Sequence, residues 1–174
     1  MTNNKEAADI KVVKIEAGSS PAKPLRNAKF KLFHGTTTTN TTWTEHEDST
    51  GVCEKTTGEN GIITFNGLVD GFYKLLETQA PVGYNAMFTP IYFKITGGAV
   101  DLTDEDGQVI DAQPLVTLTK KSSGTDEDTF TVSNTPGVVL PSTGGTGTLI
   151  YTVAGIALIV LAGVLLVSRR KRKA

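Results

Sequence analysis

The chain has 174 residues, of which 39% are hydrophobic and 20% charged, and its formal net charge is −1. All 18 acidic residues lie before residue 129, whereas five of the 17 basic residues fall at 169–173, so the body of the chain is acidic and lacks the basic patch that nucleic-acid binding requires. Cys53 is the only cysteine, which excludes an intrachain disulfide and every zinc or redox motif that needs two cysteines.

The N-terminal segment, residues 1–9, reads MTNNKEAAD and has no apolar stretch of the kind that a signal peptide needs. We interpret it as a linker or domain boundary. Because the C-terminal features described below require export, we expect the chain to be the C-terminal part of a longer surface protein or a sequence with a misplaced start.

Residues 10–136 show short alternating runs bounded by Gly, Pro, Asn and Asp, and no period of 3.6 residues. This pattern is typical of an all-β domain, and about seven strands favour an immunoglobulin-like two-sheet sandwich. The strands are expected at residues 10–15, 29–33, 61–65, 71–77, 91–95, 115–119 and 129–133.

Three of these strands each place one polar residue in the register of their apolar residues. Side chains alternate between the two faces of a strand, so residues two positions apart share a face. The polar residues are Lys14, after Ile10 and Val12; Glu77, after Tyr73 and Leu75; and Asn134, after Phe130 and Val132. An amine, a carboxyl and a carboxamide are therefore expected to point into the core.

Burial of an isolated charge costs several kcal/mol, so buried ionisable groups become neutral or form pairs. A neutral Lys14 would be a nucleophile. A protonated Glu77 would hydrogen-bond the carboxamide oxygen of Asn134, polarise it toward attack and pass its proton to the leaving ammonia. The pattern thus predicts one autocatalytic Lys–Asn isopeptide bond, a single-turnover reaction that needs no cofactor.

Each residue of this trio also has an ordinary interpretation. Lys14 would extend its amine to solvent at a strand end, Glu77 would cap a turn, and Asn134 would be a loop residue. Lys11 is an alternative nucleophile, but it lies on the opposite face of the strand from Ile10 and Val12.

Other polar residues do not predict a catalytic or metal site. His34 and His46 lie 12 residues apart without a neighbouring cysteine, so we expect solvated loop histidines and no metal. Residues 104–107 resemble part of a calcium loop, but Leu102 stands where an EF-hand has its first carboxylate, which favours a turn. We therefore expect no turnover enzyme.

The C-terminal region has three consecutive parts. Residues 137–148 form a linker that contains Leu140-Pro141-Ser142-Thr143-Gly144. Residues 149–167 are 19 uncharged residues, long enough at about 1.5 Å per residue to cross a membrane as a helix. Residues 168–174 are basic and are expected to remain in the cytoplasm, which leaves residues 1–148 outside.

This order of pentapeptide, apolar span and basic tail resembles the LPxTG cell-wall sorting signal. The resemblance implies that the protein is a sortase substrate with a transient single-pass membrane precursor. The sortase would recognise the pentapeptide, cleave between Thr143 and Gly144, and transfer Thr143 to an amine of a peptidoglycan precursor or to a lysine of a neighbouring pilin. The implied location is the extracellular face of the cell wall.

The β domain resembles the Cna-B or SpaA-like modules of Gram-positive pilins and adhesins, which have a prealbumin-like fold. Three motifs carry the resemblance: Lys14-Ile15-Glu16, the run from Tyr73 to Tyr84 that matches the E-box, and Val132-Ser133-Asn134-Thr135-Pro136. It implies that Lys14 and Asn134 form the isopeptide bond and that Glu77 catalyses its formation.

The predicted function is therefore that of a structural pilin or stalk module anchored to the cell wall. Two alternatives stay open. One is an adhesin domain that binds a host matrix protein through loops within residues 36–60. The other is the wall-anchor region of a larger surface enzyme.

Overall fold

The computed structural model describes residues 7–35, 42–122 and 127–137. The chain divides into two units, Met1–Gly137 and Val138–Ala174, and all described residues belong to the first. The predicted sorting motif at 140–144, the predicted transmembrane helix and the basic tail lie outside the described residues. Within the described ranges, no helix combines the length and the hydropathy that a membrane span requires.

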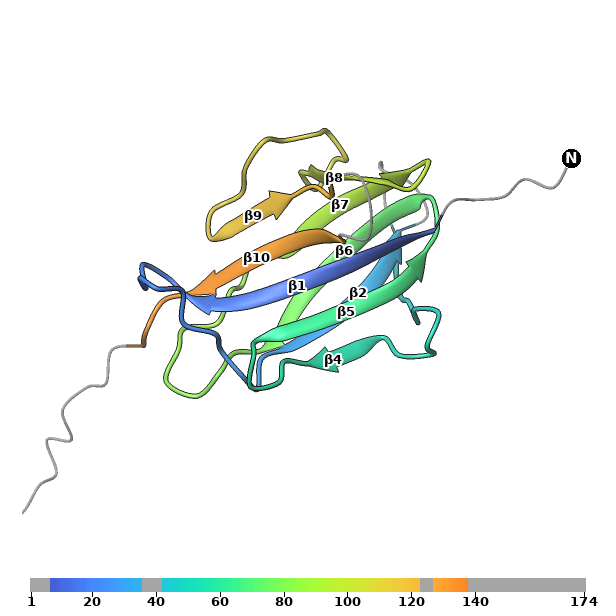
Figure 1. Cartoon of the computed structure of the whole chain (residues 1–174). Coiled ribbons are helices and arrows are strands. Elements are labelled where there is room, and N and C mark those ends of the chain that lie inside the picture. Colours follow the sequence, from blue (N-terminus) through green and yellow to red (C-terminus); the bar gives the residue numbers. More distant parts are fainter. Residues whose placement is uncertain (1–6, 36–41, 123–126, 138–174) are drawn as a thin grey trace, which may run out of the picture. The chain divides into compact units, whose positions relative to one another are not determined.

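The described residues contain ten strands in two sheets (Figure 1). The first sheet has the order β5-β1-β10-β9, with β1 (Ala8–Glu16), β5 (Ile62–Leu68), β9 (Val116–Thr119) and β10 (Asp128–Asn134). The second has the order β3-β2-β6-β7-β8, and β4 also pairs with β2. Its strands are β2 (Lys29–Gly35), β3 (Trp43–Glu45), β4 (Glu54–Thr56), β6 (Gly71–Gln79), β7 (Ile91–Thr96) and β8 (Ala99–Thr103).

This arrangement confirms the predicted all-β two-sheet sandwich, and each of the seven expected strands is present. The expected number of strands was too low, because β3, β4 and β8 were missed. β3 and β4 have three residues each, too few to show alternation in the sequence. β8 has five residues and follows Gly97 and Gly98 directly, so its short apolar run carries little signal.

The hydrophobic core fills the space between the two sheets. Phe93 on β7 stacks on Tyr73 of β6 at 5.3 Å between ring centroids, and it also contacts Phe130 on β10 at 5.3 Å. These rings join the second sheet to the first. Every buried residue of this core cluster falls between Ala8 and Val132, so the first unit contains a complete core of its own and has what it needs to fold alone.

The first and last strands of the unit are neighbours. β1 and β10 lie side by side and pair in parallel (Figure 1). In their register, Lys14 is aligned with Val132 and Glu16 with Asn134. Because the strands are parallel, the chain enters β1 at one end of the pair and leaves β10 at the other. Residues 120 positions apart in sequence are thereby brought side by side.

Candidate functional site: a buried lysine, glutamate and asparagine cluster

Lys14, Glu77 and Asn134 meet in the core between the two sheets, with 0%, 6% and 1% of their surface exposed. Lys14 Nζ lies 3.1 Å from Glu77 Oε1 and also donates a hydrogen bond to Asn134 Oδ1. Asn134 Nδ2 donates to Glu77 Oε1 at 2.9 Å and to Oε2 at 3.1 Å. The structure therefore brings the three predicted site residues into direct contact, with Glu77 supplied by the second sheet.

On the side of β1 that faces away from β10, the backbone of Lys14 bonds to residues just outside the strands. Its N–H donates to the carbonyl of Gly61 at 2.8 Å, and its carbonyl accepts from the N–H of Leu25 at 2.8 Å. Gly61 has φ +71°, and a Cβ at this position would lie 2.5 Å from the Lys14 carbonyl oxygen. Only glycine allows this approach, which fixes the position from which the lysine side chain starts.

Burial lowers the pKa of Lys14 from its ordinary value, although the carboxyl group of Glu77 opposes this shift. The Phe30 ring, whose centroid lies 5.6 Å from Nζ, forms part of the apolar surroundings. A lysine in such a site gives up its proton more readily than a solvated one, and the neutral amine is the nucleophilic form.

The contacts exclude the ordinary interpretations of Lys14 and Asn134. The Lys14 side chain has no exposed surface, so its amine does not reach solvent. Asn134 is the last residue of β10 rather than part of a loop. Lys11, the alternative nucleophile, pairs with Glu127 at 3.3 Å and keeps 35% of its side chain exposed.

The orientation of the carboxamide differs from the sequence-based prediction. Glu77 was expected to contact the carboxamide oxygen of Asn134, whereas the structure places the nitrogen Nδ2 against Glu77 and the oxygen toward Lys14. Sequence register places a residue on a face but does not determine a side-chain torsion. As a result, Glu77 Oε1 lies within hydrogen-bond distance of the amine of Lys14 and of the amide nitrogen of Asn134.

One contact of the site has no signal in the sequence. The backbone N–H of Met87, in the segment between β6 and β7, donates to Glu77 Oε2 at 2.7 Å. Every residue except proline has a backbone N–H, so no residue type marks such a donor in advance.

A second lysine–carboxylate pair, in which the lysine is only partly buried, shows what distinguishes this cluster. Lys55 Nζ lies 2.5 Å from Asp48 Oδ2, whose side chain is fully buried. Burial by itself would raise the pKa of Asp48, but hydrogen bonds from Lys55, Thr50 and Asn66 outweigh burial and hold this pKa well below its usual range. Asp48 therefore stays a carboxylate, which is a poor acylating group, and the pair remains an ion pair.

The two histidines lie closer together than the sequence suggested. His34 is in β2 rather than in a solvated loop, and its ring centroid is 5.5 Å from that of His46. Both rings contact Tyr73 edge-on, at 5.1 and 5.4 Å. The loop prediction was wrong for His34 because β2 runs two residues beyond its expected end. In the described ranges, no group of three or more potential metal ligands occurs.

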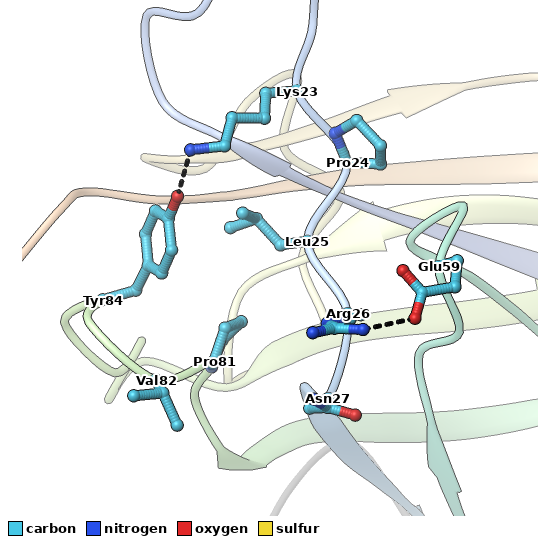
Figure 2. Close-up of a pocket in the computed structure, with 9 residues that line it drawn as sticks. All are labelled: Lys23, Pro24, Leu25, Arg26, Asn27, Glu59, Pro81, Val82 and Tyr84. Atoms are coloured by element: carbon cyan, nitrogen blue, oxygen red, sulfur yellow. Dashed lines mark hydrogen bonds and ion pairs between the residues drawn. The ribbon is translucent and has the colours of Figure 1, made fainter.

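A surface pocket of about 440 Å³ lies between residues 23–27 and residues 81–84 (Figure 2). Lys23 at its rim donates to Tyr84 at 2.9 Å and to Glu16 at 2.7 Å, and Arg26 pairs with Glu59 at 2.5 Å. The cations that line the pocket are thus already bound to groups of the same domain.

Comparison with known protein families agrees with this architecture. Residues 8–108 match the SpaA family, described as a prealbumin-like fold domain, and residues 133–174 match the LPXTG cell wall anchor motif. Together they define a cell-wall protein with a pilin-like domain, in a fold class of structural pilins and adhesins rather than enzymes. The chain belongs to the SpaA family of prealbumin-like fold domains. Its anchor motif places it on the cell-wall surface and implies processing by a sortase.

Solved structures with the same fold include pilus proteins. The pilus adhesin RrgA from Streptococcus pneumoniae is 28% identical with a TM-score of 0.54, and the match covers 79% of this chain and 16% of that one. A C-terminal fragment of the pilus adhesin SpaC from Lactobacillus rhamnosus GG is 22% identical with a TM-score of 0.54, and the match covers 79% and 48%. This chain thus spans less than half the length of either protein. Comparison with curated protein sequences gave no significant match.

Proposed function

We propose that this chain is a structural pilin or stalk module whose domain is closed by an isopeptide bond between Lys14 and Asn134. The observation that supports this most strongly is the burial of Lys14 Nζ in contact with the carboxamide of Asn134 and 3.1 Å from Glu77. Holding amine and amide together in a dry core replaces the external enzyme that such a condensation would otherwise need.

Glu77 is the proton carrier in the proposed reaction. Its Oε1 accepts a proton from the Lys14 ammonium, and the neutral amine attacks Cγ of Asn134. The proton then passes from Oε1 to Nδ2, the bond between Cγ and Nδ2 breaks, and the departing ammonia takes the second proton of the attacking nitrogen and leaves as ammonium. One ammonium group and one carboxamide become one secondary amide and one ammonium ion, so Glu77 is regenerated and no cofactor is consumed.

The position of the bond explains its mechanical use. Tension applied at the two ends of the unit would shear β1 against β10, because the two strands are parallel neighbours. A covalent bond from Lys14 to Asn134 carries this tension directly, so the chain from 15 to 133 is bypassed. Resistance to unfolding and to proteolysis then no longer depends on the hydrogen bonds between the strands.

The proposed attachment uses the C-terminal motif. A sortase recognises Leu140, Pro141 and Ser142, cleaves between Thr143 and Gly144, and joins Thr143 to an amine of a peptidoglycan precursor or to a pilin lysine. The apolar span at 149–167 retains the precursor in the membrane until this cleavage. Although RrgA is a pilus adhesin, the match spans only 16% of that protein, so host-matrix binding is not part of this proposal.

Intact mass spectrometry of the purified unit 1–137 tests the crosslink. Compared with the mass calculated from its sequence, the wild-type unit is expected to be lighter by about 17 Da, the mass of ammonia lost in the condensation. The Glu77→Ala variant is expected to have its full calculated mass. Proteolytic mapping should recover Lys14 and Asn134 in one joined peptide. A wild-type unit with its full calculated mass would refute the crosslink and leave the anchoring proposal standing.

A further inference from the structure

The two carboxyl oxygens of Glu77 have different surroundings. Oε1 contacts Lys14 Nζ at 3.1 Å and Asn134 Nδ2 at 2.9 Å, the two nitrogen atoms between which a proton must move. Oε2 accepts the Met87 N–H at 2.7 Å and has a longer contact, 3.1 Å, with Asn134 Nδ2. The shortest of these contacts is therefore made by a group that takes no part in the bond changes.

A backbone N–H constrains which oxygen of a carboxyl group holds a proton. In the neutral carboxyl group the carbonyl oxygen is the better acceptor, so an N–H directed at one oxygen favours the proton on the other. We propose that the Met87 N–H is a positioning group that binds Oε2 and so keeps Oε1 as the oxygen that carries the proton from Lys14 to Asn134. This inference rests on the crosslinking reaction proposed above.

The segment that carries the Met87 N–H is held in place by a hydrogen bond to the residue that follows Asn134. The N–H of Asn85, two residues before Met87, donates to the carbonyl of Thr135 at 3.0 Å. Thr135 directly follows Asn134, so the segment that carries Met87 is fastened to the end of the strand that carries the reacting amide. Met87 itself is 6% exposed, whereas its neighbour Phe88 is 88% exposed. The N–H of Met87 is thereby set against the core while the next residue faces solvent.

An ester in place of one peptide bond tests this role, because it removes a single N–H and leaves every side chain unchanged. The unit 1–137 can be assembled in denaturant by ligation at Cys53, its only cysteine, so the chain is unfolded and not yet crosslinked at the start. One variant carries the ester at the Met87 nitrogen. The matched control carries it at the Phe88 nitrogen, and a third chain has peptide bonds throughout.

Refolding is started by dilution, and two signals are followed: the fluorescence of Trp43 for folding, and the loss of about 17 Da for crosslinking. We expect the Met87 ester to slow crosslinking about tenfold or more relative to the Phe88 ester, since hydrogen bonds to charged groups are among the strongest in proteins. Folding should proceed at similar rates in both. Equal crosslinking rates in the two ester variants would overturn the proposal.

A spectroscopic readout separates positioning from simple stabilisation. With ¹³C in the Glu77 carboxyl group and Asn134→Ala to prevent crosslinking, the infrared carboxyl band should shift with the Met87 ester and not with the Phe88 ester. An unshifted band would contradict the proposal.

Substitution by proline, which has no backbone N–H, tests the same donor in the full chain. Uncrosslinked folded protein should accumulate for Met87→Pro and not for Phe88→Pro. If the chain with peptide bonds throughout does not lose ammonia, the crosslink itself is refuted, so the two failures are distinct.

Discussion

Replacing Glu77 by Gln changes one atom of the buried cluster and should leave the domain without its crosslink. The glutamine side chain has nearly the same shape, but it cannot accept the proton of Lys14. Lys14 and Asn134 are 120 residues apart in sequence, and closing a loop of this length removes unfolded-state entropy equivalent to about 5 kcal/mol in the chain-entropy model. The variant is expected to be less stable by at least this amount, because Lys14 also loses its buried counter-charge.

The corresponding change in melting temperature follows from the size of the unit. At about 2.1 cal/mol/K per residue, the unfolding entropy of the unit Met1–Gly137 is about 0.29 kcal/mol/K. A loss of about 5 kcal/mol then lowers the melting temperature by about 17 °C. Circular dichroism with heating measures this shift, and intact mass shows which protein is crosslinked. The denaturant dependence should also be steeper in Glu77→Gln, since an uncrosslinked chain exposes more surface on unfolding.

Asp48→Asn is the matched control for neutralising a buried carboxylate. Asp48 is paired with Lys55 as Glu77 is with Lys14, but it takes part in no proposed reaction. This variant should lose stability while it keeps the mass deficit of about 17 Da and the denaturant dependence of the wild type. Equal melting temperatures for wild type and Glu77→Gln, or a mass deficit that persists in Glu77→Gln, would refute the reasoning.

Three further predictions concern other parts of the chain. Burial, and secondarily His34, lower the pKa of His46, so the unfolded chain binds the proton more tightly, and stability should fall as the pH drops below about 6.5. Chemical denaturation at pH 7 and pH 5 measures this effect. The free energy of unfolding should differ less between the two pH values for His46→Gln than for the wild type. Gly61→Ala should lower the free energy of unfolding, measured by chemical denaturation, by about 3 kcal/mol, because the new Cβ would lie 2.5 Å from a backbone oxygen. The control Gly97→Ala, with φ +57° and no atom within 4 Å of the new Cβ, should lower it by about 1 kcal/mol. Thr143→Ala should leave the chain in the membrane fraction when cells are fractionated, whereas recovery with the cell wall would contradict the sortase assignment.

The amino-acid sequence determined the features that depend on local pattern. Alternation of apolar residues located seven of the ten strands that the structure describes, because the period of two follows from strand geometry alone. The same alternation marked Lys14, Glu77 and Asn134 as polar residues on core-facing sides. The pentapeptide, apolar run and basic tail are likewise linear features, and their match to an anchor motif needs no fold.

Tertiary structure decided what depends on residues distant in the chain. Parallel pairing of β1 with β10 brings the amine of Lys14 next to the amide of Asn134, since strand partners are determined by packing over the whole core and not by neighbouring residues. The rotation of the Asn134 carboxamide and the backbone N–H of Met87 depend on contacts that no residue type signals. Strands as short as β3 and β4 exist only because β2 offers them an edge to pair with.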